Sequence, residues 1–182
     1  MTAERPVPTV RSEHKKYRRK SMMQGSKWIR VRPLEVSDFS FVRRLASKQS
    51  NFTVPPLYVL WLLKQTNARS CLVADHVKFG PVAYVLSLLI SKPKRKVLYV
   101  WQLAASASGR RAGALDELLL GLRSFVRRTR TRSLLFTTVP DSPEFRAIRR
   151  YAYTLSAGGM RPSQKLPSIV SRSEREFVIT VR

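Results

Sequence analysis

The chain has 182 residues, of which 43% are hydrophobic, so it can form one domain with a buried core and is not a disordered polypeptide. Its formal net charge of +24 predicts attraction to anions such as nucleic acid, an anionic membrane or phosphorylated ligands. One cysteine excludes a disulfide within the chain, and one cysteine with two histidines excludes a zinc site of the Cys/His type.

The first 27 residues differ from the rest in composition. They hold eight basic and two acidic residues and show no apolar periodicity, which is typical of a flexible basic arm. The arm carries +6 of the net charge and leaves +18 on residues 28–182, where we expect a single domain. The arm alone therefore does not explain the excess charge.

No segment is typical of membrane insertion or secretion. The longest apolar runs, Val54–Leu63 and Val82–Ile90, have about half of the roughly 20 residues that a membrane-spanning helix needs. The N-terminus lacks the apolar core of a secretory signal, and the single cysteine fits a reducing compartment. We expect a soluble, cytoplasmic protein.

The first half of the chain predicts strands and two helices. Trp28–Arg32 alternates as a strand does, and Ser37 is expected to cap the first helix. Leu57–Lys64 is expected to form the second helix, followed by strands at Ser70–Ala74 and Val82–Ile90. The basic segment of residues 92–96 is expected to be a loop that reverses the chain.

The second half predicts a strand–loop–helix unit and three closing elements. Strand Val97–Ala104 precedes a helix that begins near Ala114 and carries an apolar stripe with helical spacing. The closing elements are a strand at Ser133–Val139, a helix from Pro143 to Gly158–Gly159 and a strand at Phe177–Val181. The order β-α-α-β-β-β-α-β-α-β predicts a mixed α/β layer structure.

The loop between Ala104 and Ala114 is the most informative segment. Small residues and two arginines lie between an apolar strand and a helix N-terminus, where backbone amides and the helix dipole favour a pyrophosphate. Gly109 and Gly113 permit close approach or positive φ, and Arg110 adds charged donors. The spacing is neither a dinucleotide fingerprint nor a Walker A sequence. The alternative is an ordinary loop in an arginine-rich protein.

The segment Val100–Leu119, VWQLAASASGRRAGALDELL, resembles motif A of the GNAT superfamily of N-acetyltransferases. It is most similar to the diaminobutyrate acetyltransferase branch, in which V-W-Q-V-A-V-D-P-S-x-R-G-x-G-L-A is typical, and the similarity spans roughly Trp28 to Met160. The matching residues are Val100, Trp101, Gln102, Ala104, Ser108, Arg110 and Gly113. The chain departs at Arg111, where the family has glycine, and at Leu115, where it has glycine or alanine.

The resemblance implies a GNAT-like fold with two splayed central strands, here Val97–Ala104 and Ser133–Val139, and acetyl-CoA with its pyrophosphate on Ser108–Ala114. It implies direct transfer of an acetyl group to an amine in a ternary complex, with the backbone amide of Leu103 or Ala104 receiving the thioester carbonyl. The cofactor-binding residues so implied are Leu103, Ala104, Ala105, Ser108, Gly109, Arg110, Arg111, Ala112, Gly113 and Ala114. No metal is implied.

Side-chain catalysts are harder to identify. The strand Val97–Ala104 carries no carboxylate, so a base would have to act through Tyr99, Gln102 and a chain of water molecules. Tyr151 lies on the last helix, where a tyrosine commonly protonates the departing thiolate in this superfamily; a packed tyrosine is the alternative. Asp75–His76 is interpreted as part of a turn.

The acceptor is not identified by the sequence. Tyr58 and Trp61, together with Tyr99 and Trp101, are expected to line its site, although Tyr58 and Trp61 also fit a packed core. No carboxylate stands in the segment before Leu57 to hold an ammonium group, which argues against diaminobutyrate.

A second function stays open: a catalytically degenerate GNAT-like scaffold that binds nucleic acid or a ribosomal surface. The net charge, the basic arm and the segment RRTRTR (Arg127–Arg132) favour it. A small-molecule or protein amine, nucleic acid and a second copy of the chain are thus the partners under consideration.

Overall fold

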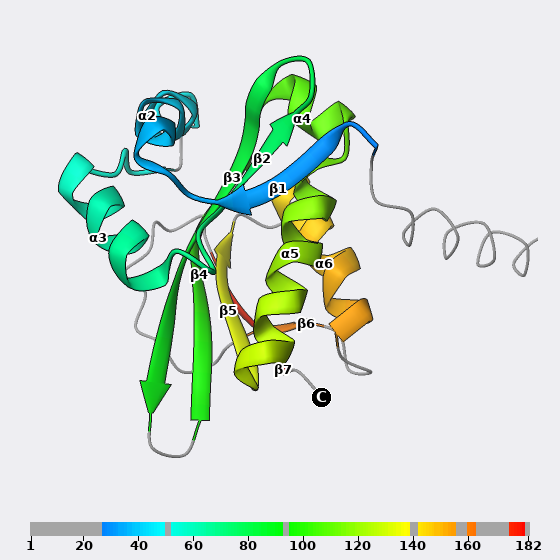
Figure 1. Ribbon diagram of the computed structural model, residues 1–182. Helices are drawn as coiled ribbons and strands as arrows, with labels where there is room; N and C mark the ends of the chain where they lie inside the picture. The colour runs from blue at the N-terminus through cyan, green and yellow to red at the C-terminus, as the bar shows by residue number, and fades with distance from the viewer. Residues whose placement is uncertain are drawn as a thin grey trace, which may run out of the picture.

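The computed structural model describes residues 27–49, 52–92, 95–138, 142–155, 160–162 and 175–180. Within these ranges a seven-stranded sheet carries helices on both faces (Figure 1). The strand order is β1-β2-β3-β4-β5-β7-β6, and β4 and β5 pair in parallel while the other neighbours pair antiparallel. The predicted mixed α/β class is confirmed; the predicted arm lies almost wholly outside the described residues.

The described strands are β1 (Ile29–Pro33), β2 (Leu72–His76), β3 (Gly80–Lys92), β4 (Arg95–Ala105), β5 (Ser133–Thr138), β6 (Met160–Pro162) and β7 (Arg175–Thr180). The described helices are the 3₁₀ turn η1 (Val36–Asp38), α2 (Phe39–Ala46), α3 (Leu57–Asn67), α4 (Ala107–Arg111), α5 (Ala114–Thr129) and α6 (Pro143–Leu155). All ten predicted elements are present in the predicted order. The sequence did not predict η1, α4 or β6.

The start of α2 differs from the prediction because Asp38, not Ser37, is the residue that organises it. The buried Asp38 carboxylate accepts a hydrogen bond from the Glu35 amide at 2.9 Å and two from the Arg32 guanidinium at 2.6 and 2.8 Å. Arg32 also donates to Asp75 at 2.6 Å, and the two carboxylates raise the pKa of Arg32. Asp75 therefore has a structural role at the end of β2, and the turn begins only after His76.

Three other boundaries move for local reasons. β2 starts at Leu72 rather than Ser70 because the amides of Ser70 and Cys71 still bond the Asn67 carbonyl at the end of α3. β3 and β4 extend into the predicted basic loop, since β3 runs to Lys92 and β4 begins at Arg95. α6 ends at Leu155, and its predicted glycine end lies outside the described residues.

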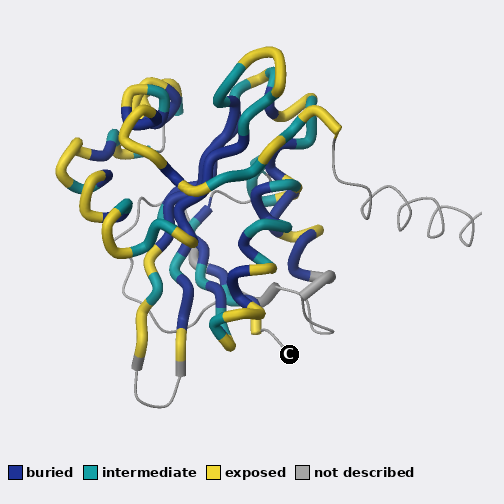
Figure 2. Tube along the Cα trace, in the orientation of Figure 1, coloured by how far each residue is buried: buried dark blue, intermediate teal, exposed yellow. Residues whose placement is uncertain are grey.

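Two hydrophobic clusters cover the two faces of the sheet. One lies under α5 and α6, and its α5 residues include the whole predicted apolar stripe, Leu115, Leu118, Leu119, Leu122 and Val126, all of them buried. The other lies under α2 and α3. Figure 2 shows the central strands buried between the two helical layers, whereas the outer side of α3 is exposed. No helix of the described residues is long and apolar enough to cross a membrane.

Candidate functional site

The two sides of β4 are paired very differently. Its β3 side is paired from Arg95 to Ala105, whereas its β5 side is paired only from Val97 to Val100, opposite Ser133 to Phe136. Beyond Val100 the strand continues to Ala105 without a described partner on the β5 side. The predicted splay of these two strands is confirmed.

A β-bulge lies where the strands part. Opposite β4, Leu86 pairs with Gln102 while its neighbour Ser87 pairs with Val100, which leaves Trp101 as an extra residue in β4. A bulge of this kind bends the strand and increases its twist, so it directs the end of β4 away from β5. The sequence analysis did not predict it.

The bulge also changes which side chains face which helices. Before the bulge, Leu98 and Val100 belong to the cluster under α5 and α6, and after it Leu103 and Ala105 belong to the same cluster. From Val100 to Leu103 the spacing is three residues, where a regular strand has two. Trp101 lies on the α2 and α3 face, where it packs half-buried against the cluster under those helices. Tyr99 lies half-buried near it, with its hydroxyl 3.4 Å from Thr137 Oγ1 of β5.

The open edge of β4 includes the backbone predicted to hold the thioester carbonyl. Consecutive amides of a strand point to opposite sides, so one of the Leu103 and Ala104 amides points toward β3 and the other toward the gap left by β5. The structure thus provides one strand amide of this pair for a ligand. Both residues are buried, with exposed fractions of 5% and 1%, so the surrounding side chains limit access of water.

Gln102 is a structural link rather than a polar group facing an acceptor. Its Oε1 accepts a hydrogen bond from the Tyr84 hydroxyl at 3.0 Å, and its Nε2 donates to the Thr53 carbonyl at 2.7 Å. Burial raises the pKa of Tyr84, which keeps its hydroxyl a donor. These bonds attach the segment before α3 to the middle of the sheet, so the predicted proton route through Gln102 is not favoured.

The predicted phosphate loop is largely the short helix α4, which corrects the prediction that the whole Ser108–Ala114 backbone is free. Ser106 caps α4: its Oγ accepts from the Gly109 amide at 3.1 Å, and its carbonyl accepts from the Arg110 amide at 2.9 Å. The amides of Ala112 and Gly113 are also bonded within the turn. A serine three residues before Gly109 is an N-cap signal that the sequence analysis did not use.

The remaining amides lie at the start of α5. Ala114 and Leu115 occupy its first two positions, where the helical ladder provides no acceptor. Gly113 precedes them with φ of 77°, and a Cβ added there would meet no atom within 4 Å, so the space beside these amides is open. Arg111 is exposed at the same place, and no carboxylate of the described residues forms an ion pair with it.

Gly109 and Arg110 have structural partners instead of the predicted ligand. A Cβ on Gly109 would lie 2.5 Å from the Val82 carbonyl oxygen, so this glycine allows α4 to pack on β3. Arg110 donates to the Ala105 carbonyl at 2.8 Å and lies 3.8 Å from Glu144 of α6. Among the described residues, the cation beside the open amides that has no ion-pair partner is therefore Arg111 rather than Arg110.

Leu115 and Tyr151 both lie in the core. The Leu115 side chain belongs to the cluster under α5 and α6, so this departure from the family motif points inward while its amide faces outward. Tyr151 is in the same cluster, and burial raises the pKa of its hydroxyl, an effect opposed by Arg123 and Arg127 of α5. A raised pKa makes Tyr151 a weaker acid, which favours the alternative of a packed tyrosine over the predicted proton donor.

Tyr58 and Trp61 are not packed in the core, and their role at the acceptor site stays a prediction. Their exposed fractions on α3 are 71% and 53%. α3 is apolar around most of its circumference, with Leu60 and Leu63 buried on the opposite side. Of the four predicted acceptor residues, the structure brings together Tyr99 and Trp101.

Solved structures similar to this chain identify its fold. Diaminobutyrate acetyltransferase EctA from Paenibacillus lautus, in complex with L-2,4-diaminobutyric acid and coenzyme A, matches with a TM-score of 0.64 and 23% identity over 84% of this chain and 95% of that one. The NatC complex bound to Gag peptide and CoA matches with a TM-score of 0.68 and 14% identity, covering 85% and 99%. An acetyltransferase of the GNAT family from Staphylococcus aureus matches with a TM-score of 0.62 and 12% identity, covering 85% and 99%.

The chain has the GNAT fold. The sequence resemblance is thus confirmed at the level of fold, including the parallel pair β4–β5 and the strand–turn–helix unit between them. No family model matches the chain, and no curated protein matches it. The described part of this GNAT-fold chain contains no group of three His, Cys, Asp or Glu side chains that could hold a metal ion.

Proposed function

We propose that this GNAT-fold protein is an N-acetyltransferase that uses acetyl-CoA and transfers the acetyl group directly to an amine. The observation that carries the proposal is the edge of β4 beyond Val100, which no described strand pairs on the β5 side, next to the open N-terminus of α5. Solved structures of this fold that contain coenzyme A, the diaminobutyrate enzyme and the NatC complex among them, support it.

The residues present fit the cofactor at two places, the start of α5 and the open edge of β4. The amides of Ala114 and Leu115, the α5 dipole and the Arg111 guanidinium would hold the pyrophosphate. The open amide of the Leu103–Ala104 pair would hold the thioester carbonyl. Bound acetyl-CoA supplies an activated acetyl group, so the protein needs to add orientation and charge stabilisation rather than a covalent step.

The chain's own contribution to the reaction is chiefly positional. A backbone amide in a buried strand donates to a developing oxyanion without reorganisation, and loss of one such donor typically costs about 10²–10³ in rate. Tyr99 and Trp101 lie on the α2 and α3 face of the same strand, where an acceptor amine would approach. With Tyr151 buried, the thiolate would take its proton from water or from the acceptor amine.

Cofactor binding tests the proposal directly. Thermal unfolding of the full chain is expected to shift upward with CoA or acetyl-CoA, because a ligand at 100 times its Kd stabilises the native state by about 2.7 kcal/mol. The absence of a shift at millimolar CoA would contradict the proposed function. Mass spectrometry of the protein as purified offers an independent check for bound CoA.

A charge-reversal pair locates the site. Arg111→Glu is expected to weaken CoA binding at least tenfold, because the variant removes a charged donor and adds a repulsive carboxylate beside the pyrophosphate. Arg128→Glu makes the same charge change at another exposed position, near the end of α5, and is expected to have a much smaller effect. Equal losses in the two variants would indicate attraction by overall charge.

The sequence-based alternative of a basic nucleic-acid-binding scaffold stays a prediction, as does a homodimer. Most of the arm on which the alternative rests lies outside the described residues. Binding of generic nucleic acid at about 50 and 200 mM salt would measure its strength, since phosphate contacts weaken steeply with salt.

A further inference from the structure

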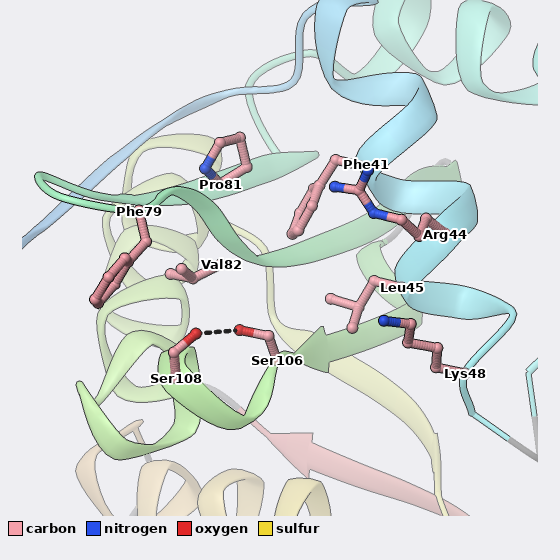
Figure 3. A pocket seen from close by; sticks show the side chains of 9 residues that line it. All are labelled: Phe41, Arg44, Leu45, Lys48, Phe79, Pro81, Val82, Ser106 and Ser108. Atoms are coloured by element: carbon pink, nitrogen blue, oxygen red, sulfur yellow. Dashed lines mark hydrogen bonds between the residues drawn. The ribbon is translucent and has the colours of Figure 1, made fainter.

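A concave site lies on the β3 side of the end of β4. A groove of about 220 Å³ separates α2 from the junction of β4 and α4, and its floor includes the first residues of β3 (Figure 3). Arg44 and Lys48 line the groove on its α2 side, and Ser106 and Ser108 line it on the opposite side. None of its lining residues is acidic.

Two cations of this groove lack an ion-pair partner. The described ion pairs use Arg32, Arg110 and Arg150, so neither Arg44 nor Lys48 has a carboxylate of the described residues within ion-pair distance. Arg44 lies in α2 and Lys48 lies two residues after its end, and both line the groove. Like charges that face one groove repel each other. An anion between them would replace this repulsion with two attractions.

The serine pair adds a hydrogen-bond donor to the same space. Ser106 Oγ and Ser108 Oγ are 2.9 Å apart, and Ser106 Oγ also accepts from the Gly109 amide. Two hydroxyl groups carry two protons, and their mutual bond uses one. Whichever serine donates in that bond, the other hydroxyl proton can be donated to an oxygen atom in the groove.

The rest of the lining is apolar and limits the size of the ligand. Phe41 and Phe79 stand on two sides of the groove, with Pro81 and Val82 between them (Figure 3). Drug-sized ligands occupy pockets of about 300–1,000 Å³, so this groove suits a smaller group. An oxyanion attached to a short apolar or aromatic body matches both parts of the lining.

The groove is close to the open edge of β4. Ser106 follows Ala104 by two residues, about 7 Å at the rise of an extended chain. Leu45, which lines the groove, belongs to the same hydrophobic cluster as Ala104. A small molecule whose anionic group lay in the groove could therefore place an amine near the backbone proposed to hold the thioester.

We propose that the groove between α2 and α4 binds a carboxylate or phosphate group of the acceptor, so that the acceptor is a small amine carrying an oxyanion. This rests on the proposed acetyltransferase function. It names the substrate class that the site selects, and it assigns Arg44, Lys48, Ser106 and Ser108 to acceptor recognition.

Binding of simple anions is the first test. In an NMR titration of the full chain, phenyl phosphate and phenylacetate are expected to shift the amide signals of Lys48, Ser106 and Ser108 in a saturable way. The neutral control, benzyl alcohol, is expected to cause no saturable shift. The phosphate and carboxylate arms show which oxyanion is preferred. The absence of saturable shifts with both anions would overturn the proposal.

Paired variants separate the groove from bulk charge. The double variant Arg44→Gln/Lys48→Gln is expected to weaken phenyl phosphate binding at least tenfold. The double variant Arg43→Gln/Arg30→Gln removes two exposed arginines that do not line the groove, and it is expected to leave binding within about twofold of the unmodified chain. Equal weakening in both would overturn the proposal, since overall charge would then explain the binding.

Acetyl transfer to matched amines is the second test. From acetyl-CoA, O-phosphotyramine is expected to react with at least tenfold higher kcat/KM than tyramine, and Arg44→Gln/Lys48→Gln is expected to remove this preference by raising KM with little change in kcat. If CoA produces no thermal shift, the proposed function fails and the acceptor assignment with it. If CoA stabilises the protein but neither oxyanion binds in the groove, only the acceptor assignment fails.

Discussion

The two sides of strand β4 differ in how fully their backbone is used. Toward β3, pairing continues to Ala105 and is reinforced by α4, which packs on β3 through Gly109. Toward β5, pairing stops at Val100. At Gly113, before α5, an added Cβ would meet no atom within 4 Å. Within the part of the chain that the structure describes, one strand thus has a side paired to β3 and a side whose last residues have no strand partner.

The difference shows how this fold makes a binding site without dedicated side chains. A buried backbone amide without a partner is costly, so folded proteins satisfy nearly all of them. Beyond Val100 such a donor points away from β3 without a described strand partner, while the ladder to β3 resumes after the bulge at Trp101 and continues to Ala105. Variants on each side of β4 test whether the β3 side determines the stability of the fold and the β5 side determines CoA binding.

The largest stability effect is expected on the β3 side. Gly109→Ala would place a Cβ 2.5 Å from the Val82 carbonyl oxygen, a backbone atom that cannot move aside without moving β3. We expect a loss of about 3 kcal/mol in the free energy of unfolding, the upper range for overpacking. Urea denaturation measures it, and a loss below about 0.5 kcal/mol would mean that α4 is not packed against β3.

Removal of the Gln102 side chain is expected to cause the next largest loss of stability. Gln102→Ala leaves the buried Tyr84 hydroxyl and the Thr53 carbonyl without their partner, at a cost of about 2 kcal/mol in unfolding free energy. Tyr84→Phe keeps the bond to Thr53 and is expected to cost about 1 kcal/mol. If the two variants were equally stable by urea denaturation, the bond to Thr53 would contribute nothing.

A pair of glycines sharpens the comparison on the β5 side. Gly113 and Gly80 both have positive φ, and an added Cβ meets no atom within 4 Å at either position. Alanine at each is expected to cost about 1 kcal/mol of stability, the strain of the left-handed conformation. Only Gly113→Ala is expected to weaken CoA binding, by roughly tenfold in calorimetric titration; an equal effect of Gly80→Ala would contradict the assigned position of the pyrophosphate.

The smallest effect is expected from the buried tyrosine. Tyr151→Phe should change kcat for acetyl transfer by less than about threefold, because Tyr151 lies in the core and burial raises the pKa of its hydroxyl. A true general acid typically contributes about 10²–10⁴ in rate. A loss of that size, measured with any amine that the protein acetylates, would return Tyr151 to the role first considered for it.

Element order was predictable because it follows from local pattern. Two local patterns predict the elements: the apolar runs of β3 and β4 and the leucine stripe of α5. Both can be recognised without knowledge of tertiary contacts. The phosphate loop was less predictable because its composition, small residues with arginine, fits both an open loop and a short capped helix. The Ser106 cap decided between them, and its bond to Gly109 is visible only in three dimensions.

The sequence by itself determined the mixed α/β class and the order of the elements, since these depend on periodicity, and its resemblance to a known motif indicated which two central strands diverge. The tertiary structure decided which donors and charges are free. It paired Arg110 with Ala105, buried Tyr151, bonded Gln102 to Thr53, and placed Arg44 and Ser106 on the lining of one groove. Whether a polar group is available depends on partners that are distant in the chain, and that information is in the packing rather than in the local pattern.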